Sequence, residues 1–162
     1  MGDNLDILRN VVEEHGDFRL SQSHPATFRA FLRSIGSNAE SLDDLRPAPA
    51  VAAFNSVLYS TCLLEEPEVG VSCIGIIEHA FATLSARIGD DVVKRGWVGS
   101  ERLVHYALHA ELDIRHANEF FLLLEPKWEI PEKRELIERG LALGAYVFDR
   151  LYRDLFGAVE RA

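Results

Sequence analysis

Apolar residues recur every three or four positions along most of the chain, which is the spacing of one face of an α-helix. No stretch alternates strictly between apolar and polar residues, as half-buried strands do. Proline, glycine and polar clusters interrupt the pattern at intervals. The sequence therefore predicts an all-α fold, a compact bundle of about six helices forming one domain over residues 1–162. We expect the helices at residues 3–15, 25–35, 49–64, 69–89, 100–124 and 131–159.

The segment 100–124 places polar residues on one face of its predicted helix. His109, Asp113 and His116 are separated by four and three residues, so at about 100° per residue their side chains stack on one side. Glu111 and other polar residues point the opposite way, which makes the stacked face the inner one. Buried ionisable groups are costly unless they are paired, hydrogen-bonded or bound to a metal. This face indicates either metal ligands or a hydrogen-bond network in the core. His105 continues it, and we expect His105 to support a ligand rather than bind a metal itself.

Three further segments place single ionisable residues on apolar faces. Glu14 lies at the centre of the apolar face of residues 3–15, whereas Glu13 sides with polar neighbours, so we expect Glu14 to be the buried one. His24 stands just before Pro25, where it either caps the following helix or acts as a ligand. Glu78 lies in the most apolar part of residues 69–89, where burial penalises its ionised form unless a cation is near.

Other residues are candidates for the surroundings of such a site. His79 points about 100° away from Glu78 and is expected to be peripheral. The apolar segment 49–64 should be largely buried, and its Asn55 and Tyr59 either line a pocket or have backbone partners in the core. Ser85 shares the face of Glu78 and is a further pocket candidate. In the last segment, the glycines at positions 140 and 144 permit close approach of a neighbouring helix.

Composition excludes several classes of function. The net charge of −9, with no basic stripe to offset it, argues against a nucleic-acid partner. No apolar run is long and uninterrupted enough to span a bilayer, and residues 1–6 lack the character of a signal peptide, so we expect a cytoplasmic protein without a membrane segment. Cys62 and Cys73 lack the spacing of a metal site and are typical of buried, reduced thiols.

The polar residues on apolar faces together make three carboxylates and three imidazoles: Glu14, His24, Glu78, His109, Asp113 and His116. Mixed oxygen and nitrogen ligands with bridging carboxylates suit two iron or manganese ions in a helical bundle. The set contains no thiolate, which disfavours structural zinc. Two divalent cations against three carboxylates leave a charge of about +1, which can hold O2-derived anions and an anionic group of a substrate.

The order and context of these residues resemble the haem-oxygenase-like diiron oxidases and oxygenases. These are iron-containing redox enzymes related to pyrroloquinoline-quinone synthase and the TenA thiaminases. The matching motifs are NVVEEHG (10–16), HPATF (24–28), IGIIEHAF (74–81) and HAELDIRH (109–116). The resemblance implies a haem-oxygenase-like helical domain in which the six residues above bind two non-haem irons. It also implies activation of O2 and oxidation of a small amine, an amino-acid-like or a fatty-acid-like metabolite.

The resemblance has one departure, and alternatives remain. Relatives usually carry helices before the one that holds the first glutamate. Either this chain is a minimal member of the family, or a second subunit supplies the pocket wall, or the catalytic role has narrowed. An apolar bundle left open on one side favours a homodimer. One alternative is a TenA-like hydrolase with Cys62 or Cys73 as nucleophile. Another is a non-catalytic module that binds a metal or a partner. A haem-binding protein is disfavoured because a proximal-type histidine would compete with several carboxylates.

Overall fold

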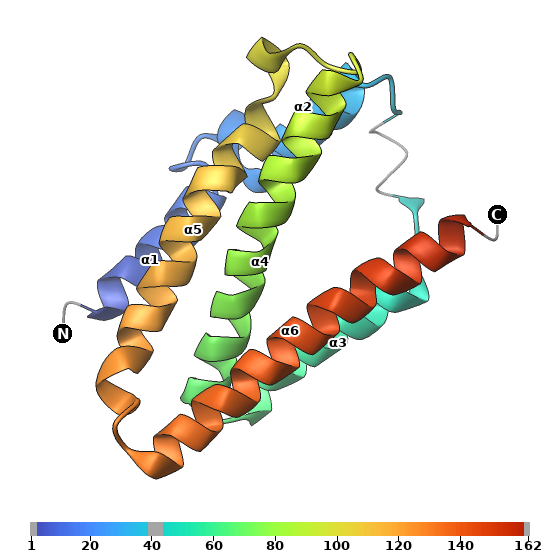
Figure 1. Ribbon diagram of the computed structural model, residues 1–162. Helices are drawn as coiled ribbons and strands as arrows, with labels where there is room; N and C mark the ends of the chain where they lie inside the picture. The colour runs from blue at the N-terminus through green and yellow to red at the C-terminus, as the bar shows by residue number, and fades with distance from the viewer. Residues whose placement is uncertain (1–2, 39–43, 161–162) are drawn as a thin grey trace. The chain divides into compact units, whose positions relative to one another are not determined.

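The structure is a computed structural model, and it describes residues 3–38 and 44–160. Within these residues the chain forms six α-helices and no strand, so the all-α prediction is confirmed. The helices are α1 (Asp3–Glu14), α2 (His24–Ser34), α3 (Pro49–Leu64), α4 (Pro67–Lys94), α5 (Val104–Leu124) and α6 (Pro131–Val159) (Figure 1). Short 3₁₀ turns at Leu20–Gln22, Ser100–Arg102 and Glu125–Lys127 precede α2, α5 and α6.

Proline marks where several helices begin. α3, α4 and α6 each start at a proline, whose fixed φ suits the first turn and whose missing N–H has no intrahelical partner there. α2 instead begins at His24, one residue before Pro25, with Ser23 as the N-cap residue. The interpretation of His24 as the capping residue is therefore wrong.

The end of α4 also differs from the prediction. The helix passes through Gly89 and ends at Lys94. Gly89 lies at a close packing contact, since a Cβ there would lie 2.9 Å from Leu103 Cδ2. Gly96, with a φ of 69°, adopts the left-handed conformation that closes the helix. α5 begins at Val104 rather than at residue 100, since a 3₁₀ turn occupies the preceding residues.

The chain divides into two compact units, each built from two stretches of sequence. The first comprises Met1–Leu45 and Phe81–His116, and the second comprises Arg46–Ala80 and Ala117–Ala162. The long helices α4 and α5 therefore each contribute residues to both units. The assignment of the whole chain to a single domain stays a prediction.

The first unit has a small core of aromatic and aliphatic side chains. Phe31, Val92, Val98 and Tyr106 are buried together, with Phe28 packed against them. The rings of Phe31 and Tyr106 meet edge to face, with their centroids 4.8 Å apart. This core fixes α2 against the end of α4 and the start of α5. It thereby holds in place the two helices that carry the histidines.

In the second unit, α3 and α6 lie side by side, and α6 also packs closely on α4 (Figure 1). A Cβ on Gly140 would collide with the Ser72 hydroxyl and with a backbone carbonyl of α4, and Gly144 meets the backbone at Cys73 in the same way. The two glycines permit the close approach predicted from their spacing.

The prediction that α3 is largely buried is wrong. Thr61 is its buried residue, and most of its other side chains are exposed or half-buried. Asn55 is exposed and Tyr59 is 71% exposed, so neither is a polar group of the core, and their role in lining a pocket stays a prediction. Apolar composition alone does not establish burial, because apolar atoms also cover much of a folded protein's surface.

α4 differs from the sequence-based expectation about membranes. It is 28 residues long, and an 18-residue window within it has a mean hydropathy of 1.5, so its length and composition suffice to cross a membrane. A core helix of a soluble protein meets the same criterion, and one such helix is weak evidence. The absence of a membrane segment stays a prediction.

Candidate metal centre

One face of α5 is buried and ionisable, as the spacing predicts. It holds His105, His109, Asp113 and His116, each at most 2% exposed. Glu111 and Arg115, which the spacing assigns to the other side, are exposed. Burying four such groups without compensation would destabilise the fold, so their partners decide what this face is for.

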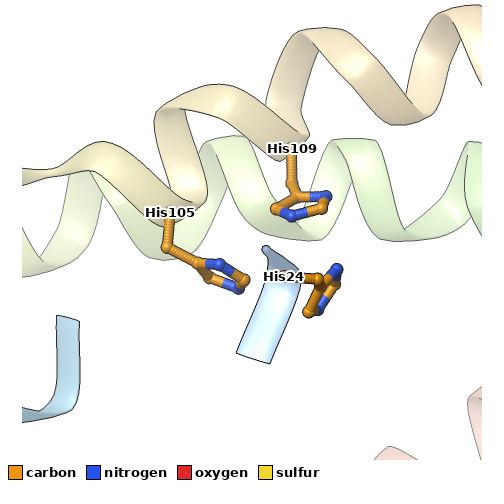
Figure 2. A group of neighbouring side chains, drawn as sticks. All are labelled: His24, His105 and His109. Atoms are coloured by element: carbon orange, nitrogen blue, oxygen red, sulfur yellow. The ribbon is translucent and has the colours of Figure 1, made fainter. Parts of the chain in front are cut away.

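Three imidazoles gather in the first unit. His24 comes from the first turn of α2, whereas His105 and His109 lie one turn apart on α5 (Figure 2). The ring centroids are 4.9 Å apart for His24 and His105, 4.2 Å for His24 and His109, and 4.7 Å for His105 and His109. Each ring offers one nitrogen, and these nitrogens all lie within 4.8 Å of one another. Such a group is of the right size to surround one metal ion.

Two of these rings hydrogen-bond a carboxylate through Nδ1. His24 Nδ1 lies 2.7 Å from Glu14 Oε2, and His109 Nδ1 lies 2.8 Å from Asp113 Oδ1. Burial raises the pKa of Glu14, but the hydrogen bond with His24 and the nearby imidazoles outweigh it, so the net shift is downward. An ionised carboxylate only accepts hydrogen bonds, so Nδ1 donates in both pairs.

The third ring hydrogen-bonds a hydroxyl that sequence reasoning missed. Thr27 is 6% exposed, and its Oγ1 donates to the His24 carbonyl oxygen at 3.0 Å. The same Oγ1 lies 3.0 Å from His105 Nδ1. Burial, with the neighbouring imidazoles, lowers the pKa of His105 to about 3, so this ring is neutral at physiological pH.

A mixed oxygen and nitrogen group adjoins the imidazoles. Glu14, His109 and Asp113 offer ligand atoms that all lie within 4.8 Å of one another. Asp113 Oδ2 is buried and has no hydrogen-bond partner among the described residues. An unpaired buried carboxylate oxygen is costly, and a cation bound at this oxygen would remove the cost. The donor set of carboxylates and imidazoles, without thiolate, fits iron.

The roles predicted for the two adjacent glutamates of α1 need correction. The Glu13 side chain is 15% exposed and that of Glu14 is 32% exposed, so the expectation that Glu14 is the buried one is wrong. Glu13 Oε2 accepts hydrogen bonds from His116 Nε2 at 3.0 Å and from Arg115 at 2.8 Å. Glu14 Oε1 lies 3.7 Å from His116 Nδ1. Both carboxylates therefore interact with the histidines.

Three further candidates differ in burial. Glu78 is a half-buried residue of α4 in the second unit, and its role as a ligand stays a prediction. His79 is exposed, with its ring centroid 6.5 Å from that of Phe121, as suits a peripheral residue. Ser85 is fully buried in the first unit, and its hydroxyl has no hydrogen-bond partner among the described residues.

The two cysteines have opposite environments. Cys73 is 0% exposed, as predicted. Its pKa is raised to about 11, mainly by burial and to a smaller extent by the nearby Cys62. Cys62 is exposed, which contradicts the expectation that both thiols are buried. A catalytic cysteine needs its thiolate form, so the environment of Cys73 disfavours the hydrolase alternative for that residue.

An all-α protein with a buried cluster of imidazoles and carboxylates has the architecture of helical proteins that bind metals in their core. A family model described as "Iron-containing redox enzyme" matches residues 4–147 of the 162-residue chain. The chain belongs to this family, which confirms the resemblance noted in its motifs. No curated protein and no solved structure matches the chain significantly.

Proposed function

We propose that this protein is an oxidoreductase that uses O2 and two non-haem irons. The ligands would be Glu14, His24, Glu78, His109, Asp113 and His116, and manganese is the alternative metal. Membership in an iron-containing redox family supports iron chemistry. The observation that carries the proposal is the orphaned Asp113 Oδ2, buried among imidazoles and carboxylates spaced as metal ligands. Bound iron supplies the electrons that reduce O2, and the residues of the chain hold, orient and shield that chemistry.

A cavity beside the candidate ligands supports binding of a small substrate. It has a volume of about 500 Å³ and is lined by Glu14, His24, Phe18 and Leu20 among others. Phe18 has a φ of 64°, which a non-glycine residue rarely adopts, and its side chain is 82% exposed. A partly apolar wall next to a carboxylate and an imidazole suits a medium-sized amine, amino-acid-like or fatty-acid-like metabolite.

Iron loading tests the proposal. The apoprotein is loaded anaerobically with Fe(II), desalted and analysed for iron, and its O2 consumption is then followed with and without a chelator. We expect about two irons per chain and O2 consumption that the chelator abolishes. Asp113→Asn removes the orphaned charge while keeping the shape, and we expect it to retain less iron. Exposed Glu111→Gln on the same helix is the control. A wild-type chain that retains no iron under these conditions contradicts the proposal.

We also propose that the protein acts as a cytoplasmic homodimer without a nucleic-acid or membrane partner. Large apolar side chains such as Phe18, Leu20 and Leu64 are more than 80% exposed, and a second copy would cover some of these side chains. Light scattering during size-exclusion chromatography should give twice the mass of the chain. A monomer at all concentrations contradicts this assignment.

A further inference from the structure

His105 has the surroundings of a metal ligand, although neither the spacing of α5 nor the family motifs assign it that role. It is 1% exposed, and its ring lies between those of His24 and Tyr106. With His24 and His109 it forms a group of three imidazoles, each offering a nitrogen within 4.8 Å of the others (Figure 2). The question is which nitrogen of each ring carries the lone pair.

The hydrogen bonds answer this for all three rings. Nδ1 of His24 donates to the Glu14 carboxylate, and Nδ1 of His109 donates to the Asp113 carboxylate. The Thr27 hydroxyl has one proton, which it gives to the His24 carbonyl, so its oxygen accepts the Nδ1 proton of His105. In a neutral imidazole one nitrogen donates and the other accepts. In the neutral form, which a histidine must adopt to bind a metal, Nε2 is therefore the lone-pair nitrogen of each ring.

Metal-bound histidines show the same arrangement. A histidine that ligates a metal through one nitrogen almost always donates its other N–H to a carboxylate, a carbonyl or another acceptor, which fixes the tautomer and the ring orientation. Here the acceptors are the Glu14 carboxylate for His24, the Thr27 hydroxyl for His105 and the Asp113 carboxylate for His109. Lone pairs on neighbouring rings repel one another, and a shared cation would convert that repulsion into binding.

We propose that His105 is a metal ligand, and that His24, His105 and His109 together bind one divalent transition-metal ion through Nε2. The inference deepens the proposed iron site and rests on it, because it gives one of the two ions a face made of three imidazoles. Thr27 is a positioning residue that acts through His105. Glu14 and Asp113 keep one carboxylate oxygen each for other partners, since their second oxygen accepts from a histidine.

Zinc binding followed by NMR tests the assignment without any activity. Full-length apoprotein labelled with 15N-histidine is titrated with Zn(II), and the Nδ1 and Nε2 resonances of each ring are followed. We expect Nε2 of His105 to move to a metal-bound position while Nδ1 keeps its proton. Zn(II) affinity is then measured for three variants. His105→Gln should weaken it by more than about 100-fold and Thr27→Val by about 10-fold, whereas exposed His15→Gln should leave it unchanged.

The outcomes separate the two proposals. If the wild type binds zinc but the His105 nitrogens do not respond, His105 is not a ligand and the inference is overturned, while the iron site stands. If the wild type binds neither zinc nor iron, both proposals fail. Should His105→Gln not fold, the NMR titration of the wild type still decides the question.

Discussion

Replacing Glu13 by alanine removes a carboxylate that connects α1 to both His116 and Arg115. His116 is 1% exposed, so its Nε2–H loses its acceptor in a place with little access to water. Leaving a buried donor unsatisfied costs about 1–3 kcal/mol. The ion pair with Arg115 adds at most about 1 kcal/mol, since that side chain is 46% exposed. We expect Glu13→Ala to lower the free energy of unfolding of the apoprotein by about 2–3 kcal/mol.

The same substitution should weaken metal binding. Glu13 holds the His116 ring with Nδ1 turned toward Glu14, which lies 3.7 Å away. Losing an acceptor that orients a ligating histidine typically costs about 10- to 100-fold in metal affinity. Glu13→Gln keeps an acceptor oxygen but not the charge, so we expect about half the loss of stability.

Urea denaturation of the apoprotein and competitive metal titration measure the two effects separately. Glu111→Ala is the matched control, because Glu111 is an exposed glutamate of α5, and its effect should stay within about 0.5 kcal/mol. If Glu13→Ala unfolds at the wild-type urea concentration and keeps the wild-type metal affinity, Glu13 does not position His116 and the reasoning is refuted.

Three further predictions concern the second unit. The Lys127 hydrogen bond outweighs burial and holds the pKa of Glu68, which is 3% exposed, at about 2 instead of 4.5. A pKa difference of this size corresponds to about 3 kcal/mol of stabilisation of the folded state. Solvent screening reduces the value to about 1–2 kcal/mol, because the lysine is 40% exposed. Since the pKa is lowered on folding, the stabilisation is present above pH 4.5 and disappears as the pH falls toward 2. Glu68→Gln should therefore cost that amount at pH 7 and little near pH 2 in urea titrations. Gly140→Ala should lower the melting temperature, because its Cβ collides with the backbone of α4, and overpacking costs about 1–3 kcal/mol. A thiol reagent should modify exposed Cys62 quickly and Cys73 only on unfolding, because burial raises the pKa of Cys73 to about 11.

Each of these has an outcome that contradicts it. A constant difference between wild type and Glu68→Gln from pH 7 to pH 2 would show that packing, not charge, stabilises that position. Alanine is the better helix former by about 1 kcal/mol, so a higher melting temperature for Gly140→Ala would mean that α6 does not approach α4 closely. The Cys62→Ser variant keeps Cys73 as its single thiol. Fast modification of this variant in its folded state would therefore show that Cys73 lies at the surface.

Local periodicity explains what the sequence predicts well. Helix formation and the choice of buried face depend on neighbours three and four residues away, so the spacing of His109, Asp113 and His116 is enough to place them inward. The Gly140 and Gly144 spacing succeeds for the same reason. Helix ends are less certain, because Gly89 looks like a stop in the sequence and is a packing contact in the structure.

Partners distant in sequence explain what the sequence does not predict. Glu13 and Glu14 lie about 100° apart around α1, so either could face the core. Which of them is more buried depends on α5, because Glu13 accepts a hydrogen bond from His116, 103 residues away in the sequence. Thr27 has an ordinary context for a helical threonine, and its contact with His105 spans 78 residues. The exposure of α3 likewise depends on how much of its apolar surface other helices cover, which its composition does not reveal.

The charges of the first unit point to the same conclusion as its hydrogen bonds. Glu13, Glu14 and Asp113 each lie within hydrogen-bond distance of a histidine, and Glu13 also pairs with Arg115. Three ionised carboxylates and one guanidinium sum to a charge of −2 beside the histidines. A carboxylate close to an imidazole favours its protonated form, so a metal ion competes with protons for the ring nitrogens. A divalent ion bound among the histidines would offset the charge of this group of residues at the place where the ring nitrogens lie.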